Sequence, residues 1–157
     1  MPAVDHKEPE FSEKLMSDDY FNSFNLSEYC KGLQHLNDAY NAYEKYNTEM
    51  FISGEEYDYD TIQSTANKLG RRVTEIQERL SEKLKMLFYE WCDAYNADTK
   101  DSIRARVIND LCEALCIDAF DAELFIVRSF SHEGKIEINL KSQISKAIDQ
   151  LLSHKKN

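Results

Sequence analysis

The residues that most often interrupt helices are scarce in this sequence, which has four Gly and two Pro among 157 residues. Gly weakens a helix interior and Pro breaks it, whereas loop-rich and β-rich proteins use both in their turns. With 42% apolar and 31% charged residues, the composition therefore indicates a soluble helical protein of one domain.

Long apolar runs are also absent from the sequence. No stretch approaches the roughly 20 residues that cross a bilayer, and the N-terminus lacks the apolar core of a signal peptide. We therefore expect a cytoplasmic protein with no membrane span. The cysteines fall beside apolar residues in predicted helices, where we expect buried free thiols at Cys30, Cys92, Cys112 and Cys116.

Motifs of catalysis and metal binding are missing as well. The sequence has no glycine-rich phosphate loop, nucleophile elbow or Glu-x-x-His pair. Cys112 and Cys116 are one helical turn apart, but no His stands at a recognised ligand spacing from them. The acidic loop at 55–60 lacks the residue order of an EF-hand. We therefore expect no enzyme, no metal and no cofactor.

Negative charge is concentrated in the first 60 residues, which hold 14 Asp and Glu against four Lys. Residues 61–157 hold 15 acids and 15 bases, so the formal net charge of −10 lies entirely in the first part. An acidic segment repels phosphate and attracts basic surfaces. Nucleic-acid binding is therefore not expected, and the segment is either a solubilising face or a surface for a basic partner.

The residues from 60 to 96 predict one long helix around which the rest of the chain is organised. Asp60 is the expected N-cap. The spacing is a strict heptad to Leu80 and then gains one residue at Leu84, a shift that turns the apolar face. The two halves should therefore face different neighbours. The apolar residues at helical spacing are Ile62, Ala66, Leu69, Val73, Ile76, Leu80, Leu84, Leu87, Trp91 and Tyr95.

A second heptad pattern precedes this helix, and it predicts an antiparallel hairpin with the character of a coiled coil. Asn25 or Ser27 is the expected N-cap and Gly54 the expected end. The register places Tyr29 near Lys83 or Leu84, with the acidic first helix along the basic residues of 68–85. The tyrosines indicate a partly buried seam. The seam positions are Leu26, Tyr29, Leu33, Leu36, Tyr40, Tyr43, Asn47 and Met50.

The segments outside the hairpin are shorter. Residues 1–10 are polar and acidic and predict a disordered N-terminus, and residues 11–24 predict a short helix that completes the hairpin unit of 11–96. Residues 102–157 predict a helix-turn-helix-like subdomain packed as part of one domain. Within it, the pattern of 124–130 fits helix or strand, and the alternation of 135–140 is typical of a short β element.

We therefore expect an all-α protein, a long antiparallel helical hairpin with a C-terminal helical subdomain, that acts as an adaptor or assembly subunit with another protein as its partner. The apolar surface beyond the first hairpin helix must be covered by 11–24, by the C-terminal third or by that partner. The candidate binding residues are Phe88, Trp91, Tyr95, Glu55, Glu56, Tyr57 and Tyr59.

Three alternatives to this interpretation stay open. The first is an acidic inhibitor or immunity-type protein that masks a basic surface of a toxin, nuclease or transcription factor. The second, less favoured, is a regulator that binds nucleic acid through the helix-turn-helix-like unit. The third is a homodimer formed through the tyrosine-rich seam.

Overall fold

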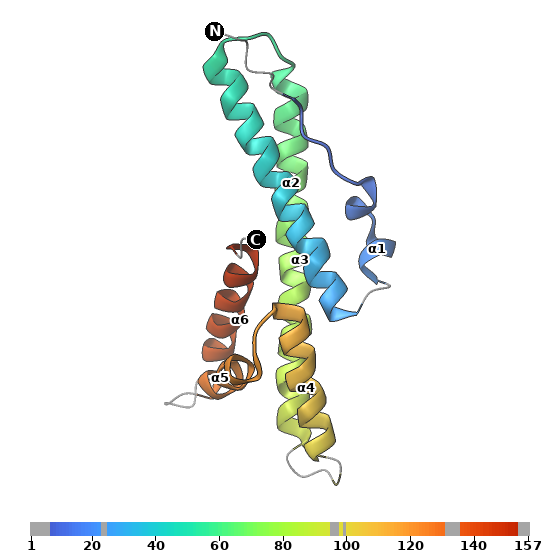
Figure 1. Cartoon of the computed structure of the whole chain (residues 1–157), viewed down its shortest axis with the longest axis vertical. Helices are drawn as coiled ribbons and strands as arrows, with labels where there is room; N and C mark the ends of the chain where they lie inside the picture. Colours follow the sequence, from blue (N-terminus) through green and yellow to red (C-terminus); the bar gives the residue numbers. More distant parts are fainter. Residues whose placement is uncertain (1–6, 23–24, 95–97, 99, 131–135, 154–157) are drawn as a thin grey trace.

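The computed structural model describes residues 7–22, 25–94, 98, 100–130 and 136–153. Over these residues the chain is all-α and contains no strand, and none of the helices there is long and apolar enough to cross a membrane. Figure 1 shows an elongated molecule in which the other helices pack along one long helix. The elements are η1 (Glu13–Met16), α1 (Asp18–Asn22), α2 (Leu26–Ser53), α3 (Tyr59–Asp93), α4 (Lys100–Leu115), α5 (Ala119–Ser129) and α6 (Ile136–Ser153).

Helices α2 and α3 form the predicted antiparallel hairpin. Asn25 caps α2 by accepting the N–H of Glu28 at 2.9 Å, and Gly54 ends it with a φ of 71°, a left-handed conformation that Gly adopts without strain. Both predictions are confirmed. The prediction that Asp60 caps the next helix was wrong, because Asp58 accepts both the N–H and the hydroxyl of Thr61, at 3.2 and 2.6 Å.

The register of the hairpin agrees with the heptad prediction. The ammonium of Lys83 lies 5.3 Å from the ring centroid of Tyr29. Nearer the loop, the side-chain amide of Asn47 donates to the side chain of Gln63 at 2.8 Å. The seam between these two points is closed by fully buried side chains, among them Leu33, Leu36, Leu69 and Ile76.

The expectation of a partly buried seam was wrong for two of its tyrosines, since Tyr29 and Tyr43 are buried. The N-terminal segment supplies the cover. The ring of Phe21 meets that of Tyr29 edge to face at 5.1 Å, and Phe11 meets Tyr43 in the same way at 6.0 Å. Aromatic rings favour such edge-to-face contacts.

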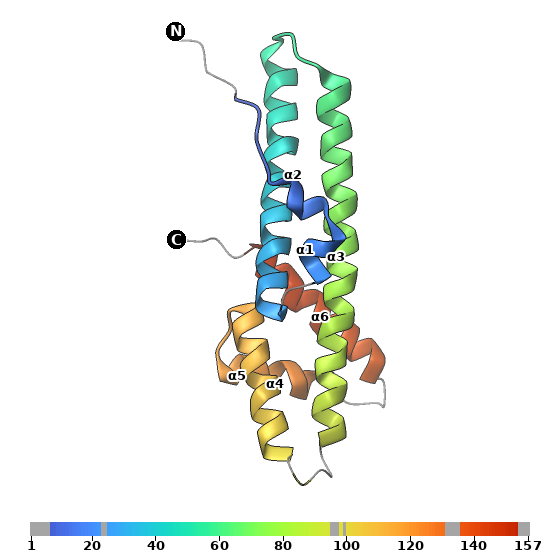
Figure 2. The ribbon, with the colours of Figure 1, turned by 90° about the vertical axis from the view of Figure 1, so that its right-hand side faces the viewer.

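Residues 7–22 form an N-terminal arm that runs along α2 and then reaches α3 with η1 and α1 (Figure 2). The buried guanidinium of Arg72 donates to the carbonyl oxygen of Leu15 at 3.1 Å and to the carboxylate of Asp18 at 2.9 Å. Arg79 donates to the same carboxylate at 3.2 Å. These two basic side chains of α3 therefore pair with the arm and not, as expected, with α2.

Helix α2 lies beside the first half of α3, and helix α4 lies beside the second half, as Figures 1 and 2 both show. The hydroxyl of Ser27, at the start of α2, donates to the carbonyl oxygen of Glu113, near the end of α4, at 3.4 Å. Helix α6 packs across the middle of the molecule, where Gln34 donates to the carbonyl oxygen of Leu151 at 3.2 Å. The C-terminal third therefore covers α3 where α2 has ended.

The C-terminal third is helical at both places where the sequence also allowed a strand. Residues 124–129 belong to a helix, which Asp118 caps by accepting the N–H of Asp121 at 2.8 Å. The β element expected near 135–140 was wrong over residues 136–140, which form the start of α6. The alternation there is only six residues long, and the same residues continue a helical spacing whose buried positions are Leu140, Ile144, Ile148 and Leu151.

Candidate interaction surfaces

The aromatic region around Trp91 is covered by the C-terminal third and not by the N-terminal arm. Phe88 is 1% exposed, and its ring centroid lies 5.1 Å from that of Phe130, at the end of α5. Trp91 is half-buried, with the guanidinium carbon of Arg104 from α4 at 4.7 Å from its ring centroid. Phe88 is therefore a core residue, and Trp91 keeps only part of its ring accessible. Tyr95 lies outside the described residues.

The turn of the apolar face along α3 explains this placement. After Leu80 the buried positions advance by four residues, to Leu84 and then to Phe88. Two successive steps of four rotate the face by about 80° around the helix. The shift at Leu84 is as predicted, but the face continues at Phe88 and leaves Leu87 and Trp91 at its edge.

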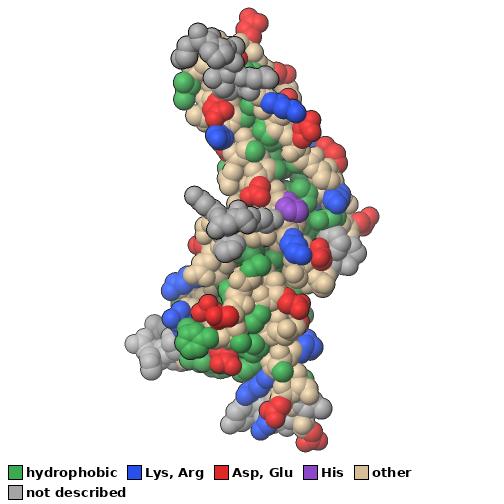
Figure 3. All heavy atoms as spheres, viewed as in Figure 1, with side chains coloured by type: hydrophobic (Ala, Val, Ile, Leu, Met, Phe, Trp, Pro, Cys, Tyr) green, Lys and Arg blue, Asp and Glu red, His purple; other side chains and the backbone are tan. Residues whose placement is uncertain are grey.

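An exposed apolar stripe runs along α5, and we call Phe120, Leu124 and Val127 the α5 stripe. Phe120 and Val127 are 67% and 63% exposed, and Leu124 is half-buried. Figure 3 shows hydrophobic side chains gathered on the surface over α5. The opposite face of α5 enters the core through Ala122, Phe125, Ile126 and Ser129. The sequence contains this signal as apolar residues at i, i+4 and i+7, but most of these residues also belong to a short apolar run that fits a buried strand.

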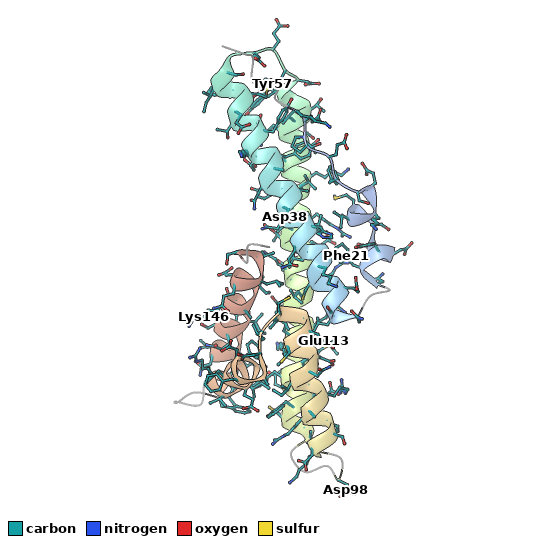
Figure 4. All side chains as sticks on the ribbon, viewed as in Figure 1. Phe21, Asp38, Tyr57, Asp98, Glu113 and Lys146 are labelled. Carbon is teal, nitrogen blue, oxygen red and sulfur yellow. The ribbon has the colours of Figure 1, made fainter. Side chains whose placement is uncertain are left out.

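A second exposed surface lies at the tip of the hairpin, at the opposite end of the molecule from Asp98 (Figure 4 labels Tyr57 and Asp98). The tip comprises residues 47–60. Four predicted binding residues meet here: Glu55, Glu56 and Tyr59 are exposed, and Tyr57 is half-buried. The predicted residues therefore form two separate groups, because Phe88 and Trp91 lie in the second half of α3.

Phe51 and Ile52 are the most exposed large apolar side chains at the tip, at 76% and 77%. Sequence reasoning missed them, because they extend the apolar run after the last seam residue, Met50, and look like its continuation. Helix α2 continues to Ser53, about one turn beyond the last seam residue. The side chains in this extra turn have no facing helix to pack against and are exposed. Beside them lies a surface hollow lined by Asn47, Thr48, Phe51, Tyr57 and Tyr59.

The thiols are less uniformly buried than expected. Cys30 is buried, and burial raises its pKa to about 12. Cys92 and Cys112 are half-buried, and the prediction was wrong for Cys116, which is exposed beyond the end of α4 with a φ of 56°. Leu115 is the last residue of α4 and is buried, whereas Cys116 follows the helix and no longer lies on its buried face. Over the part of the chain that the structure describes, no three His, Cys, Asp or Glu side chains are grouped as metal ligands would be.

These elements define an all-α protein whose long hairpin carries a C-terminal group of helices at one end and an open tip at the other. Comparison of the chain with models of protein families, with curated proteins and with solved structures found no match.

Proposed function

We propose that this chain is a non-enzymatic protein–protein interaction module, an adaptor or assembly subunit that binds another protein through the α5 stripe. One observation carries the proposal: α5 is apolar on the face that enters the core and on the face directed to solvent. The stripe is bordered by the exposed side chains of Asp121, Glu123 and Arg128, and the solvent face of an amphipathic helix normally carries only polar residues of this kind. A surface of this kind is typical of binding sites.

The energetics of the stripe favour binding over simple exposure. Removing a Phe or Val side chain from water contributes about 1.5–3 kcal/mol each, so Phe120 and Val127 could anchor a partner helix or groove. Ile138, at the start of α6, is also exposed. Helix α5 is held by its core face and by the Asp118 cap, so the stripe is presented on a rigid element and little ordering cost is left for the bound state.

The experiment compares protein capture from native lysate by the wild type and by Val127→Glu. Because Val127 is exposed, the charge should leave the fold intact, as far-UV circular dichroism and the melting temperature would report, while abolishing capture through the stripe. Met86→Glu, at an apolar side chain on α3 that is 69% exposed, is the matched control and should capture normally. Equal capture by all three proteins would contradict the proposal.

Self-association is the other use that the stripe could serve. Sedimentation velocity of the purified chain separates the two cases, because a homodimer built on the stripe should become a monomer in Val127→Glu and remain a dimer in Met86→Glu. A wild type that is monomeric at all concentrations leaves a different protein as the partner of the stripe.

A second candidate function is the masking of a basic surface on another protein. What supports it is the charge of the tip: residues 46–67 hold five carboxylates and no Lys, Arg or His. Salt separates the two functions, since charges at a surface are screened over a Debye length of about 8 Å at physiological ionic strength whereas apolar contacts are not. Capture that disappears between 50 and 500 mM NaCl would favour masking, and capture that persists would favour the α5 stripe.

A further inference from the structure

The tip of the hairpin combines three features: adjacent exposed apolar side chains, exposed carboxylates in the loop and at the start of α3, and a loop that hydrogen bonds tie to both helices. Phe51 and Ile52 are more than three-quarters exposed, and Phe51 lines the same hollow as Tyr57 and Tyr59. A single exposed apolar side chain would need no explanation. Several around one hollow form a surface that a partner's side chain can fill.

The shape of the hollow is fixed by a hydrogen-bonded chain from the loop to both helices. The hydroxyl of Tyr57 donates to the side-chain oxygen of Asn47 at 3.1 Å, and the amide of Asn47 donates to Gln63 on α3 at 2.8 Å. The ring of Tyr59 meets that of Tyr57 edge to face at 6.1 Å. The polar residue in the seam thus holds the loop in place, and a preformed site loses less conformational entropy when it binds.

The charge of the tip favours one class of partner. Among the described residues, no ion pair involves Glu55, Glu56 or Asp60, and all three are exposed. No basic residue lies between Lys45 and Lys68 in the sequence. Nucleic acids and anionic membranes carry phosphate and would be repelled, as would the tip of a second copy. Lys and Arg side chains would be attracted.

We infer that the tip is a docking site for a basic segment of another protein, in which Lys or Arg side chains flank an aromatic or aliphatic residue that enters the hollow beside Phe51. This inference rests on the proposed role in protein–protein interaction and adds a second surface, with its own partner chemistry, to the α5 stripe. The apolar residue supplies affinity, and the flanking charges supply orientation and rate of association.

The test uses the full chain and two fluorescein-labelled synthetic peptides, one with a Trp between two groups of three Lys and one with Ala in place of that Trp. Fluorescence anisotropy measures binding at 50 and 300 mM NaCl. We expect the Trp peptide to bind more tightly than the Ala peptide by about tenfold, and to lose affinity at the higher salt concentration.

Two double variants locate the binding site at the tip. Phe51→Ala/Ile52→Ala and Glu55→Gln/Glu56→Gln should each weaken binding of the Trp peptide by about tenfold. All four residues are exposed, so the fold should remain intact, as circular dichroism would report. The matched controls are Met86→Ala, on α3, for apolar exposure and Glu78→Gln/Glu82→Gln, also on α3, for charge; both should bind like the wild type.

Three results would overturn the inference. These are no binding of the Trp peptide, unchanged binding by Phe51→Ala/Ile52→Ala, and equal weakening by the two charge variants, which would show diffuse attraction to an acidic protein. None of them bears on capture through Val127, so the failure of the tip inference remains distinguishable from the failure of the proposed function.

Discussion

Arg72 of the long helix and Asp18 of the N-terminal arm form an ion pair of 2.9 Å whose guanidinium is almost completely removed from solvent. The same guanidinium donates to the carbonyl oxygen of Leu15 and lies 5.2 Å from the ring centroid of Phe21. One side chain of α3 therefore fixes three points of the arm. Burying a charge without its partners is costly. We therefore expect the docked position of the arm and the buried position of the Arg72 side chain to depend on each other.

The arm contact should depend on acid pH through Asp18. The hydrogen bond from Arg72 and the charge of Arg79 hold the pKa of Asp18 below its ordinary value of 3.8. The contact is therefore complete above pH 3.8 and is lost as the pH falls through the lowered pKa. Hydrogen exchange of the backbone amides of residues 13–22 should be slow at pH 7 and should accelerate, relative to α2, below that value.

The variant Asp18→Asn isolates this effect from the other carboxylates. Glu75, which also accepts from Arg72 and Arg79, remains in the variant and keeps part of the charge balance. We expect faster exchange of the arm at pH 7 and a weaker acid response in Asp18→Asn, with the wild-type pattern retained in Glu13→Gln, an exposed position on the same arm. Identical acid profiles for all three proteins would show that Asp18 does not hold the arm.

Two helix glycines should respond in opposite ways to replacement by Ala. A Cβ added at Gly32 would lie 2.7 Å from the ring of Phe21, which is buried, whereas one at Gly70 would lie 2.9 Å from the ring of Tyr40, which is half-exposed and can move. Ala favours a helix over Gly by about 1 kcal/mol. We expect urea unfolding to show Gly70→Ala as neutral or stabilised.

For Gly32→Ala, the steric conflict should exceed the helix gain, since overpacking a core costs about 1–3 kcal/mol. The arm should be displaced, with faster hydrogen exchange over residues 13–22, while α2 and α3 remain paired. A Gly32→Ala protein that is more stable than the wild type and keeps a protected arm would contradict the placement of Phe21.

The hydroxyl of Tyr29 is buried and makes no hydrogen bond to the described residues, and burial raises its pKa to about 12 from 10. An unsatisfied buried hydroxyl costs about 1–3 kcal/mol, so Tyr29→Phe should stabilise the protein by about 1 kcal/mol. Between pH 10 and 12 the unfolded state ionises first, so the wild type should lose stability that Tyr29→Phe retains. Thermal melts at pH 7 and pH 11 check both points, and a destabilised Tyr29→Phe would contradict them.

The hairpin could be predicted from the sequence because its determinants are local. Each signal is read from residues close together in the sequence. These signals are the heptad spacing from Leu26 to Met50, the Asn25 cap and the glycine at 54. The β element near 135–140 could not be excluded in this way. Its six residues satisfy a period of two and a helical period equally, and the decision depended on burying Leu140 and Ile144 against the rest of the fold.

The candidate surfaces were harder to predict, because the exposure of a side chain depends on which segment, distant in sequence, packs over it. Phe88 and Trp91 were equally plausible anchors until the end of α5 covered one and Arg104 of α4 covered part of the other. The acidic charge of the loop pointed to the binding residues predicted at the tip. Phe51 and Ile52, in contrast, continue an apolar run and therefore looked like core residues. The α5 stripe is visible in the sequence only after the segment is known to be a helix at the edge of the molecule.

Photo-crosslinking from the α5 stripe tests directly whether this surface binds another protein. A photoreactive phenylalanine analogue is placed at Val127, or at Met86 as the control, and the protein is irradiated in native lysate. We expect this binding to give a discrete adduct from position 127 and none from position 86. The absence of any adduct from 127, or the same adducts from both positions, would contradict it.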